Sequence, residues 1–161
     1  MKKKVLFVCL GNICRSPAAE GIFRDMVKEA GLTTEIEADS AGTGAWHVGD
    51  GPDGRMIAHA ARRGYDIRDL EGRQFSAPAD FRNFDYILTM DNSNLKNVLA
   101  LDPKREYQNK VRPLLTFCRV HQGVEEVPDP YYKEDQGFEY VLDLLEDACT
   151  ELLKHLQKGL G

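Results

Sequence analysis

Residues 5–16 of the chain, Val-Leu-Phe-Val-Cys-Leu-Gly-Asn-Ile-Cys-Arg-Ser, decide its fold. A run of four apolar residues leads into a short polar loop and then into Ser16-Pro17-Ala18-Ala19-Glu20, a sequence that favours the start of a helix. A buried strand that turns directly into a helix points backbone N–H groups and the positive end of the helix dipole at one place. The stretch therefore predicts an anion-binding loop at residues 9–16, after the first strand of an α/β fold.

The rest of the chain alternates between expected strands and helices. Strands are expected at residues 4–8, 35–40, 84–90 and 111–117, and helices at residues 16–30, 52–63, 91–100 and 136–157. The last helix has the clearest period, because its apolar residues share one face: Phe138, Val141, Leu142, Leu145, Cys149, Leu152, Leu153 and Leu156. This alternation predicts a parallel sheet covered by helices on both faces, in one domain spanning residues 1–161.

Composition and charge narrow the class of protein. The chain has 161 residues, a net charge of −5 and 42% hydrophobic residues, which suits a globular protein and argues against nucleic acid as the main partner. The three lysines at residues 2–4 precede only four apolar residues, too few for an export signal, and no segment approaches the length of a membrane span. We therefore expect a cytoplasmic protein without membrane insertion.

The cysteines and histidines show no metal-ligand or disulfide pattern. The four cysteines, at positions 9, 14, 118 and 149, lack a regular framework and fit reduced thiols. The four histidines, at positions 47, 59, 121 and 155, lack the spacing of metal ligands. We expect no metal and no other cofactor.

The chemistry of the loop depends on a thiol and a guanidinium. Cys9 is a nucleophile only as a thiolate, which the helix dipole, Arg15 and Ser16 can stabilise. Arginine suits a phosphoryl group because its planar fork binds two oxygens at once. Gly11 permits close approach of the backbone, and Asn12 tolerates the left-handed conformation that a tight curl requires. Cys9 alone fits a buried structural cysteine, but the full Cys-x5-Arg-Ser string favours a nucleophile facing a phosphate.

Residues 8–17 resemble the signature of the low-molecular-weight protein tyrosine phosphatases. The likeness continues in the family's order through residues 39–42 (Asp-Ser-Ala-Gly), 84–91 (Phe-Asp-Tyr-Ile-Leu-Thr-Met-Asp) and 128–132 (Pro-Asp-Pro-Tyr-Tyr). The resemblance implies a three-layer sandwich with a four-stranded parallel sheet. It also implies hydrolysis of phosphotyrosine through a phosphocysteine intermediate, without a metal.

Roles for the loop residues follow from this resemblance. It implies that Cys9 is the nucleophile, that Arg15 binds the phosphate and that Ser16 supports the thiolate. Asn12 and Ser40 would hold the loop in its curl. The loop is completed by Leu10, Gly11, Ile13 and Cys14. Asp91 matches a family position that supports the loop, and it fits a helix N-cap equally well.

The resemblance implies that Asp129 is the general acid. A tyrosyl group leaves as a phenolate whose conjugate acid has a pKa of about 10, and protonating it is typically worth roughly 10² to 10⁴ in rate. The same carboxylate could then activate the attacking water. Chemistry alone does not separate Asp129 from Asp102, which also precedes a proline, but the surrounding block at residues 128–132 selects Asp129.

Aromatic residues are the expected walls of the pocket. Trp46, Tyr131 and Tyr132 would flank a flat aryl group, although Trp46 also suits a core position and the tyrosines suit a half-exposed loop. Ile13 stands where a related branch that resembles arginine phosphatases carries Thr. The apolar side chain of Ile13 therefore favours phosphotyrosine as the substrate. Ile13 fits simple packing against the sheet as well.

The resemblance also has regulatory implications. It implies that Cys14 forms a disulfide with Cys9 under peroxide and that Tyr131 and Tyr132 are potential targets of kinases. Expected partners are tyrosine-phosphorylated proteins, with a cognate tyrosine kinase left open, and a monomer or weak homodimer. Cys118 and Cys149 are expected to be core or surface thiols.

Two rival functions share parts of the pattern. A thiol-linked arsenate reductase would relay oxidation through additional cysteines near the third strand, but residues 82–94 contain none. A non-catalytic phosphotyrosine-binding module would lack the nucleophile or the acid.

Overall fold

A four-stranded parallel sheet forms the centre of the protein. The computed structural model describes residues 2–131 and 133–160. Its strands are β1 (Lys3–Cys9), β2 (Ile36–Gly42), β3 (Tyr86–Thr89) and β4 (Val111–Pro113), in the order β2-β1-β3-β4. Every neighbouring pair is parallel. The predicted α/β fold class is confirmed.

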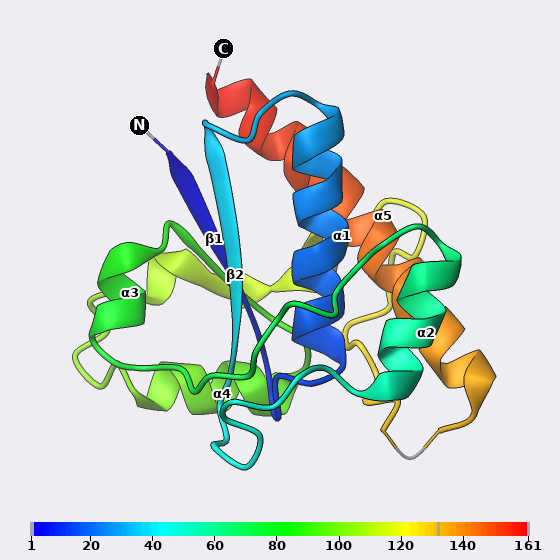
Figure 1. Ribbon diagram of the computed structural model, residues 1–161. Helices are drawn as coiled ribbons and strands as arrows, with labels where there is room; N and C mark the ends of the chain where they lie inside the picture. Colours follow the sequence, from blue (N-terminus) through cyan, green and yellow to red (C-terminus); the bar gives the residue numbers. More distant parts are fainter. Residues whose placement is uncertain (1, 132, 161) are drawn as a thin grey trace.

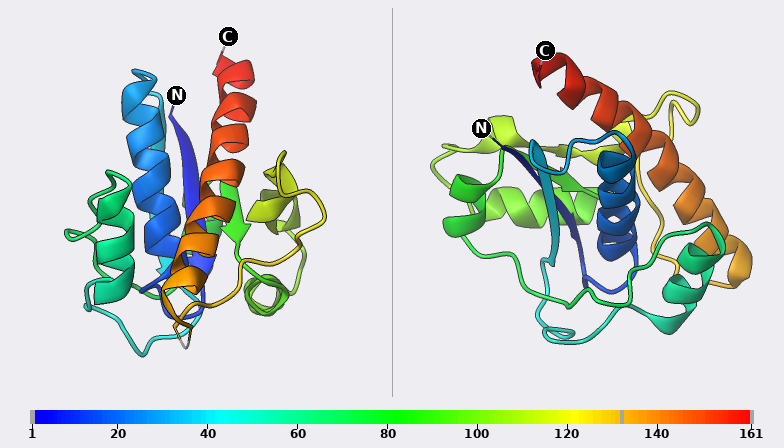
Figure 2. Two further views of the ribbon diagram at one scale, coloured as in Figure 1. Left: turned by 90° about the vertical axis from the view of Figure 1, so that its right-hand side faces the viewer. Right: turned by 45° about the horizontal axis from the view of Figure 1, so that its top comes forward.

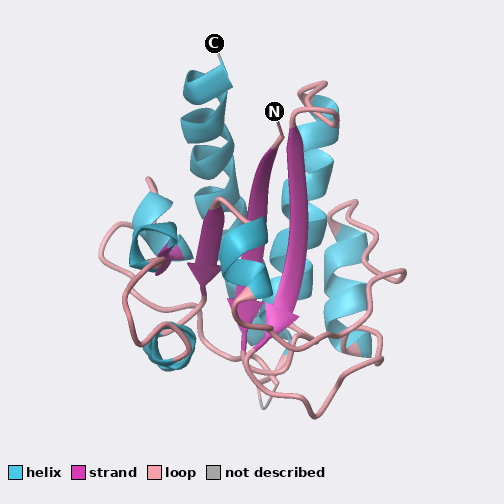
Figure 3. Ribbon diagram, turned by 90° about the vertical axis from the view of Figure 1, so that its left-hand side faces the viewer, coloured by secondary structure: helices cyan, strands magenta, loops and turns pink. Residues whose placement is uncertain are grey.

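Helices cover both faces of the sheet (Figures 1 and 3). One face carries α1 (Arg15–Glu29), α2 (Gly54–Arg62) and α5 (Asp135–Leu160), and the other carries α3 (Ala79–Asn83) and α4 (Asn92–Ala100). Because β1 lies between these layers, its residues alternate between two apolar cores. Val5 and Phe7 belong to the larger core, and Leu6 and Val8 belong to the smaller one. The expected three-layer arrangement is thus built on a strand that is apolar throughout.

The long helix α5 packs lengthwise against α1 (Figure 2). All eight residues of the predicted apolar stripe are buried. Their spacing repeats with the helical period, so that one continuous face of the helix is removed from water. The periodicity therefore identified both the helix and its buried face.

The fourth strand is shorter than predicted, and one short helix was not predicted. The strand expected at residues 111–117 ends at Pro113, and a 3-10 helix (Leu114–Phe117) follows. Proline has no N–H to donate to a sheet ladder, so the strand stops there. Leu114 and Leu115 bury their side chains as part of the 3-10 helix instead. The short helix α3 was not predicted, since five residues are too few to show a period.

The starts of two helices were also misplaced. The residue at the N-cap of α1 is Cys14, and the helix begins at Arg15, one residue before the start expected at Ser16. The Ser16 hydroxyl has tertiary partners instead of a backbone N–H of its own helix. The next helix, α2, begins at Gly54 after Asp53, whose carboxylate accepts from the Arg55 N–H.

The carboxyl ends of β1 and β2 point to the lower end of the molecule in Figure 1, and β3 runs parallel to β1. The loop between β1 and α1, the loop between β2 and α2, and the segment that leads into α5 meet there. Parallel α/β sheets bind ligands at this edge. Within residues 2–131 and 133–160, no helix combines the length and apolar character needed to cross a membrane.

Candidate active site

The loop after β1 curls around the sulfur of Cys9. Asn12 adopts a left-handed conformation with a φ of 58°, and its backbone N–H lies 3.3 Å from the Cys9 sulfur, to which it donates. The end of β2 lies directly behind this curl. A Cβ at Gly42 would lie 2.7 Å from the Leu10 carbonyl oxygen, so the close approach requires glycine. The expected left-handed curl is confirmed at Asn12.

The amide of Asn12 sets the direction of the hydrogen bonds behind the loop. Its Oδ1 accepts from the Arg73 backbone N–H at 3.0 Å, so its Nδ2 faces the two serines. This nitrogen donates to Ser16 Oγ at 2.8 Å and to Ser40 Oγ at 3.0 Å. Because Ser16 Oγ accepts from Asn12, its own hydrogen is available for the Cys9 sulfur, 3.0 Å away. The network therefore presents Ser16 to Cys9 as a hydrogen-bond donor.

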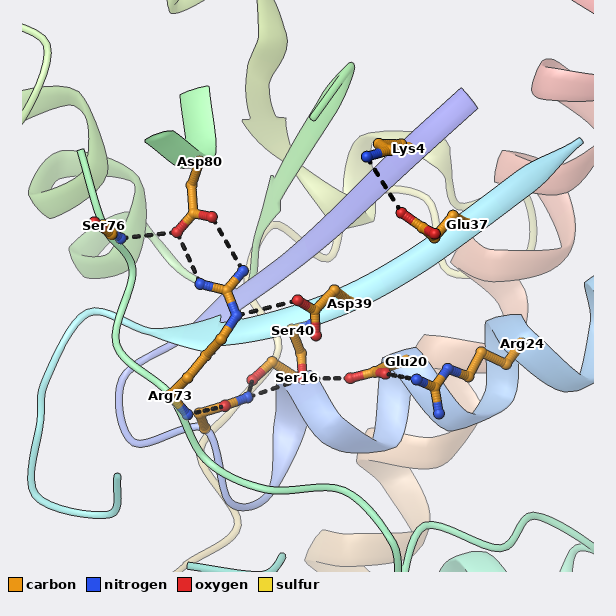
Figure 4. Close-up of polar contacts among 11 residues, drawn as sticks. Lys4, Ser16, Glu20, Arg24, Glu37, Asp39, Ser40, Arg73, Ser76 and Asp80 are labelled. Carbon is orange, nitrogen blue, oxygen red and sulfur yellow. Dashed lines mark hydrogen bonds and ion pairs between the residues drawn. The ribbon is translucent and has the colours of Figure 1, made fainter. Parts of the chain in front are cut away.

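A buried carboxyl group terminates this network. Ser40 Oγ donates to Oε1 of Glu20 at 2.7 Å, and only 2% of Glu20 is exposed. Arg24 lies 2.7 Å from Oε2, in an orientation that forms an ion pair without a hydrogen bond. Burial raises the pKa of Glu20 to about 7, against the opposing effects of the Ser40 hydrogen bond and Arg24. Figure 4 shows these side chains along α1 and β2.

Arg73 connects the backbone behind the loop to one helix and one strand. Its guanidinium donates to both carboxylate oxygens of Asp80, at 2.9 and 3.1 Å, and to Asp39 at 3.1 Å (Figure 4). Asp80 is buried and belongs to α3, whereas Asp39 belongs to β2. The position of the Arg73 N–H, and with it the orientation of Asn12, is therefore held by charged contacts.

Arg15 is buried at the base of the site and has acceptors on two sides. Its Nη1 donates to Asp91 at 2.6 Å and to the Val127 carbonyl at 3.0 Å, and only 3% of its side chain is exposed. Its Nη2 lies 3.8 Å from Oδ2 of Asp129. Burial alone would lower the pKa of Arg15, but Cys9, Asp91 and Asp129 together raise it above its usual value. The guanidinium is thus fixed in place as a permanent positive charge.

Asp129 reaches the site on a segment that is docked onto the end of β3. The Val127 N–H donates to the Met90 carbonyl at 2.7 Å, two residues before Asp129. Oδ1 of Asp129 accepts from the Tyr131 N–H at 3.1 Å, and 43% of its side chain is exposed. Asp102 has a different position, since its buried carboxylate caps a turn through two backbone N–H groups at residues 106 and 107.

These groups surround a pocket of about 210 Å³. The residues lining it are Cys9, Leu10, Gly11, Ile13, Cys14, Arg15, Trp46, His47, Asp129 and Tyr131. Asn12, Ser16 and Ser40 are buried and are not among the lining residues. Trp46 is 73% exposed at the rim, so the alternative that it fills the core is wrong. Tyr132 lies outside the described residues.

The structure also shows where Ile13 and the other three cysteines lie. Cys14 is buried, and burial, Asp53 and Cys9 raise its thiol pKa well above the ordinary value. Ile13 both lines the pocket and packs against the larger core. Cys118 and Cys149 are buried core thiols. Among the residues that the structure describes, no cluster of histidine, cysteine or acidic residues could hold a metal.

Several residues around the site had weak signals or none in the sequence. Asp91 fulfils both of its predicted roles, because it accepts from the Asn94 N–H at the start of α4 and pairs with Arg15. His47 lines the pocket, but nothing in its sequence context indicated it. Glu20 and Arg73 were missed because their partners are distant in sequence.

The fold and the site together define an α/β protein with a Cys-x5-Arg loop after its first strand and an aspartate facing that loop. Residues 4–160 match the family described as low molecular weight phosphotyrosine protein phosphatase, and the chain belongs to this family. A Synechocystis sp. protein described as a candidate low molecular weight protein-tyrosine-phosphatase is 52% identical, over 98% of both chains.

Solved structures agree with this assignment. The crystal structure of a protein tyrosine phosphatase from Entamoeba histolytica matches with a TM-score of 0.93 and 43% identity, over 99% of this chain and 100% of that one. The fold also matches a Drosophila arginine phosphatase, with a TM-score of 0.86 and 34% identity over 97% and 98% of the two chains.

Proposed function

We propose that the protein hydrolyses phosphotyrosine in proteins by two-step covalent catalysis. The observation that carries the proposal is the convergence of Cys9, Arg15 and Asp129 on one pocket, with Ser16 oriented as a donor to the sulfur. This arrangement supplies a nucleophile, a fixed anion-binding charge and a proton donor.

In the first step, the Cys9 thiolate attacks phosphorus while Arg15 and the loop N–H groups hold the non-bridging oxygens. The P–S bond forms as the bond between phosphorus and the tyrosyl oxygen breaks. Asp129, in its protonated form, transfers its proton to the departing oxygen. Asp91 and the Val127 carbonyl keep the Arg15 guanidinium in one orientation throughout.

In the second step, water attacks the phosphocysteine. The Asp129 carboxylate takes a proton from this water, the P–S bond breaks, and inorganic phosphate leaves. Ser16 donates to the sulfur as its negative charge returns. The loop thus stabilises the same thiolate as nucleophile and as leaving group.

The pocket walls favour an aryl substrate. Ile13, Trp46 and Tyr131 present apolar or aromatic surface beside the anion site, and Tyr132 is proposed to extend this wall. The exposed Trp46 rim leaves the entrance open to a phosphotyrosine carried by a protein. We further propose that residues 1–161 form one domain, acting as a monomer or weak dimer in the cytoplasm, where the four free thiols would stay reduced.

The test uses phenyl phosphate in the presence of a metal chelator. We expect turnover by the parent protein, none by Cys9→Ser, and a loss of roughly 10² to 10⁴ in Asp129→Ala. Full activity of Cys9→Ser would refute the covalent mechanism. Phosphoarginine and arsenate with a thioredoxin system serve as rival substrates, and faster turnover of either would refute the substrate assignment.

A further inference from the structure

Arg55 connects the proposed pocket wall to the start of α5. Its Nε and Nη2 donate to the two carboxylate oxygens of Asp53, at 3.1 and 2.9 Å. The same guanidinium lies over two aromatic rings, 5.3 Å from the centre of the Tyr131 ring and 4.9 Å from that of Phe138. A guanidinium held by a carboxylate in this way can present its face to an aromatic ring at little further entropic cost.

Asp53 contacts the anion-binding loop, and Tyr131 contacts the proposed general acid. At one end, the Asp53 N–H donates to the carbonyl of Ile13 in the anion-binding loop, at 2.8 Å. At the other end, the Tyr131 N–H donates to Oδ1 of Asp129. Contacts therefore run from the loop that holds the phosphate, through Asp53, Arg55 and Tyr131, to the carboxylate that would protonate the leaving group.

The chain contains a second copy of the same local pairing. Arg68 donates through Nε and Nη2 to Asp66, with both distances 2.9 Å, and its backbone N–H donates to the same carboxylate. This pair is exposed and is not part of the lining of the proposed active pocket. An Asp-x-Arg pair thus forms without any link to the site, and the contacts with Tyr131 and Phe138 are what distinguish Arg55.

We propose that Arg55 is a positioning residue that holds Tyr131, and through it Asp129, at the distance from the anion-binding loop that proton transfer needs. The inference rests on the proposed role of Asp129 as general acid. Val127 docks the segment before Asp129 to β3, and Arg55 restrains the segment after it against α2. Without the second restraint, the carboxylate samples positions from which the proton transfer is slower.

The test compares two leaving groups, because proton donation matters only for a poor one. Phenyl phosphate releases a phenol with a pKa of about 10, whereas 2,4-dinitrophenyl phosphate releases a far more acidic phenol that leaves without help. The value of kcat/KM reports the first chemical step with each. The test variant is Arg55→Met, and Arg68→Met is the matched control because it removes the same local pairing.

We expect Arg55→Met to lose about three- to tenfold in kcat/KM on phenyl phosphate and less than about twofold on the dinitrophenyl ester. Arg68→Met should match the parent on both. In an Asp129→Ala background, Arg55→Met should cause no further loss, since both changes remove the same proton transfer.

Other outcomes overturn the inference. An equal loss on both esters would show a general structural effect, and a rise in KM on both esters with unchanged kcat would show that Arg55 contacts the substrate. Parent-like values on both esters would show that it has no role. The proposed function is tested separately by Asp129→Ala: if that variant loses equally on both esters, Asp129 is not the acid, whatever Arg55 does.

Discussion

The guanidinium of Arg15 lies 2.6 Å from the carboxylate of Asp91 and is almost completely buried. The same carboxylate caps α4, where its other oxygen accepts from the Asn94 N–H at 2.8 Å. One aspartate at the end of β3 therefore fixes both a helix and the cation of the proposed phosphate site. A rigid cation can bind two phosphate oxygens without first being oriented, which lowers the barrier to phosphoryl transfer.

Substitutions at Asp91 separate its two roles. Asparagine keeps an N-cap and an acceptor for Arg15, whereas serine keeps the cap but is too short to reach the guanidinium. We expect kcat on an aryl phosphate to stay within about threefold of the parent in Asp91→Asn and to fall about ten- to a hundredfold in Asp91→Ser. Steady-state kinetics measures the difference, and urea unfolding checks that both variants stay folded. Equal losses would mean that the charge, rather than the orientation, of Asp91 matters.

Substitutions at Asn12 separate backbone strain from the hydrogen bonds. Alanine and glycine both remove the amide that orients Ser16, but only glycine adopts the left-handed conformation without strain. We expect both variants to lose at least about tenfold in activity. Asn12→Gly should unfold with a free energy about 1 kcal/mol higher than that of Asn12→Ala.

The rate at which Cys9 reacts with iodoacetamide at mildly acidic pH is the second measurement. It should fall in both Asn12 variants, because Ser16 is no longer held as a donor to the thiolate. A parent-like alkylation rate in Asn12→Gly would contradict the proposed direction of the hydrogen bonds.

The sequence predicts the sheet, its helices and the loop at residues 9–16 because those signals are local. A continuous apolar run at β1 and the period of α5 each report burial directly. These features depend on neighbours in the chain, so they can be found without the structure. Asp129, by contrast, was distinguished from Asp102 only by the resemblance of residues 128–132 to a known family.

Features that depend on distant partners could not be predicted in this way. The Asn12 amide is oriented by the backbone N–H of Arg73, which lies 61 residues away in the chain. Arg55 and Arg68 occur in the same local pattern, and only the fold places one of them over Tyr131. The resemblance to a family supplied the roles of matching positions, whereas the contacts of Glu20 required the structure.

Substitution of Cys14 tests the redox role implied by the family. Cys14 is buried and its thiol pKa is raised, so peroxide should first oxidise Cys9, to a sulfenic acid. Attack by the Cys14 sulfur would then form a disulfide and release water. Without Cys14, a second equivalent of peroxide would oxidise the Cys9 sulfenic acid to a sulfinic acid, which dithiothreitol does not reduce. We therefore expect dithiothreitol to restore most activity of the peroxide-treated parent and little of a treated Cys14→Ser variant. Equal recovery of the two proteins would exclude Cys14 as a protecting thiol.

Burial of Glu20 makes the stability of the protein depend on pH. Its pKa is about 7 in the folded protein, above the ordinary value of 4.5, so between these pH values the folded state holds a proton that the unfolded state has lost. The contribution of this group to stability is therefore present at low pH and is lost as the pH rises through about 7.

Glu20→Gln removes this titration while keeping an acceptor for Ser40. We expect the free energy of unfolding of Glu20→Gln, relative to the parent, to rise by up to about 3 kcal/mol between about pH 5 and about pH 8. Urea unfolding at the two pH values measures the change, and Glu29→Gln, at an exposed position of the same helix, is the matched control. A pH-independent difference between Glu20→Gln and the parent would show that Glu20 has the same charge in the folded and unfolded states throughout this range.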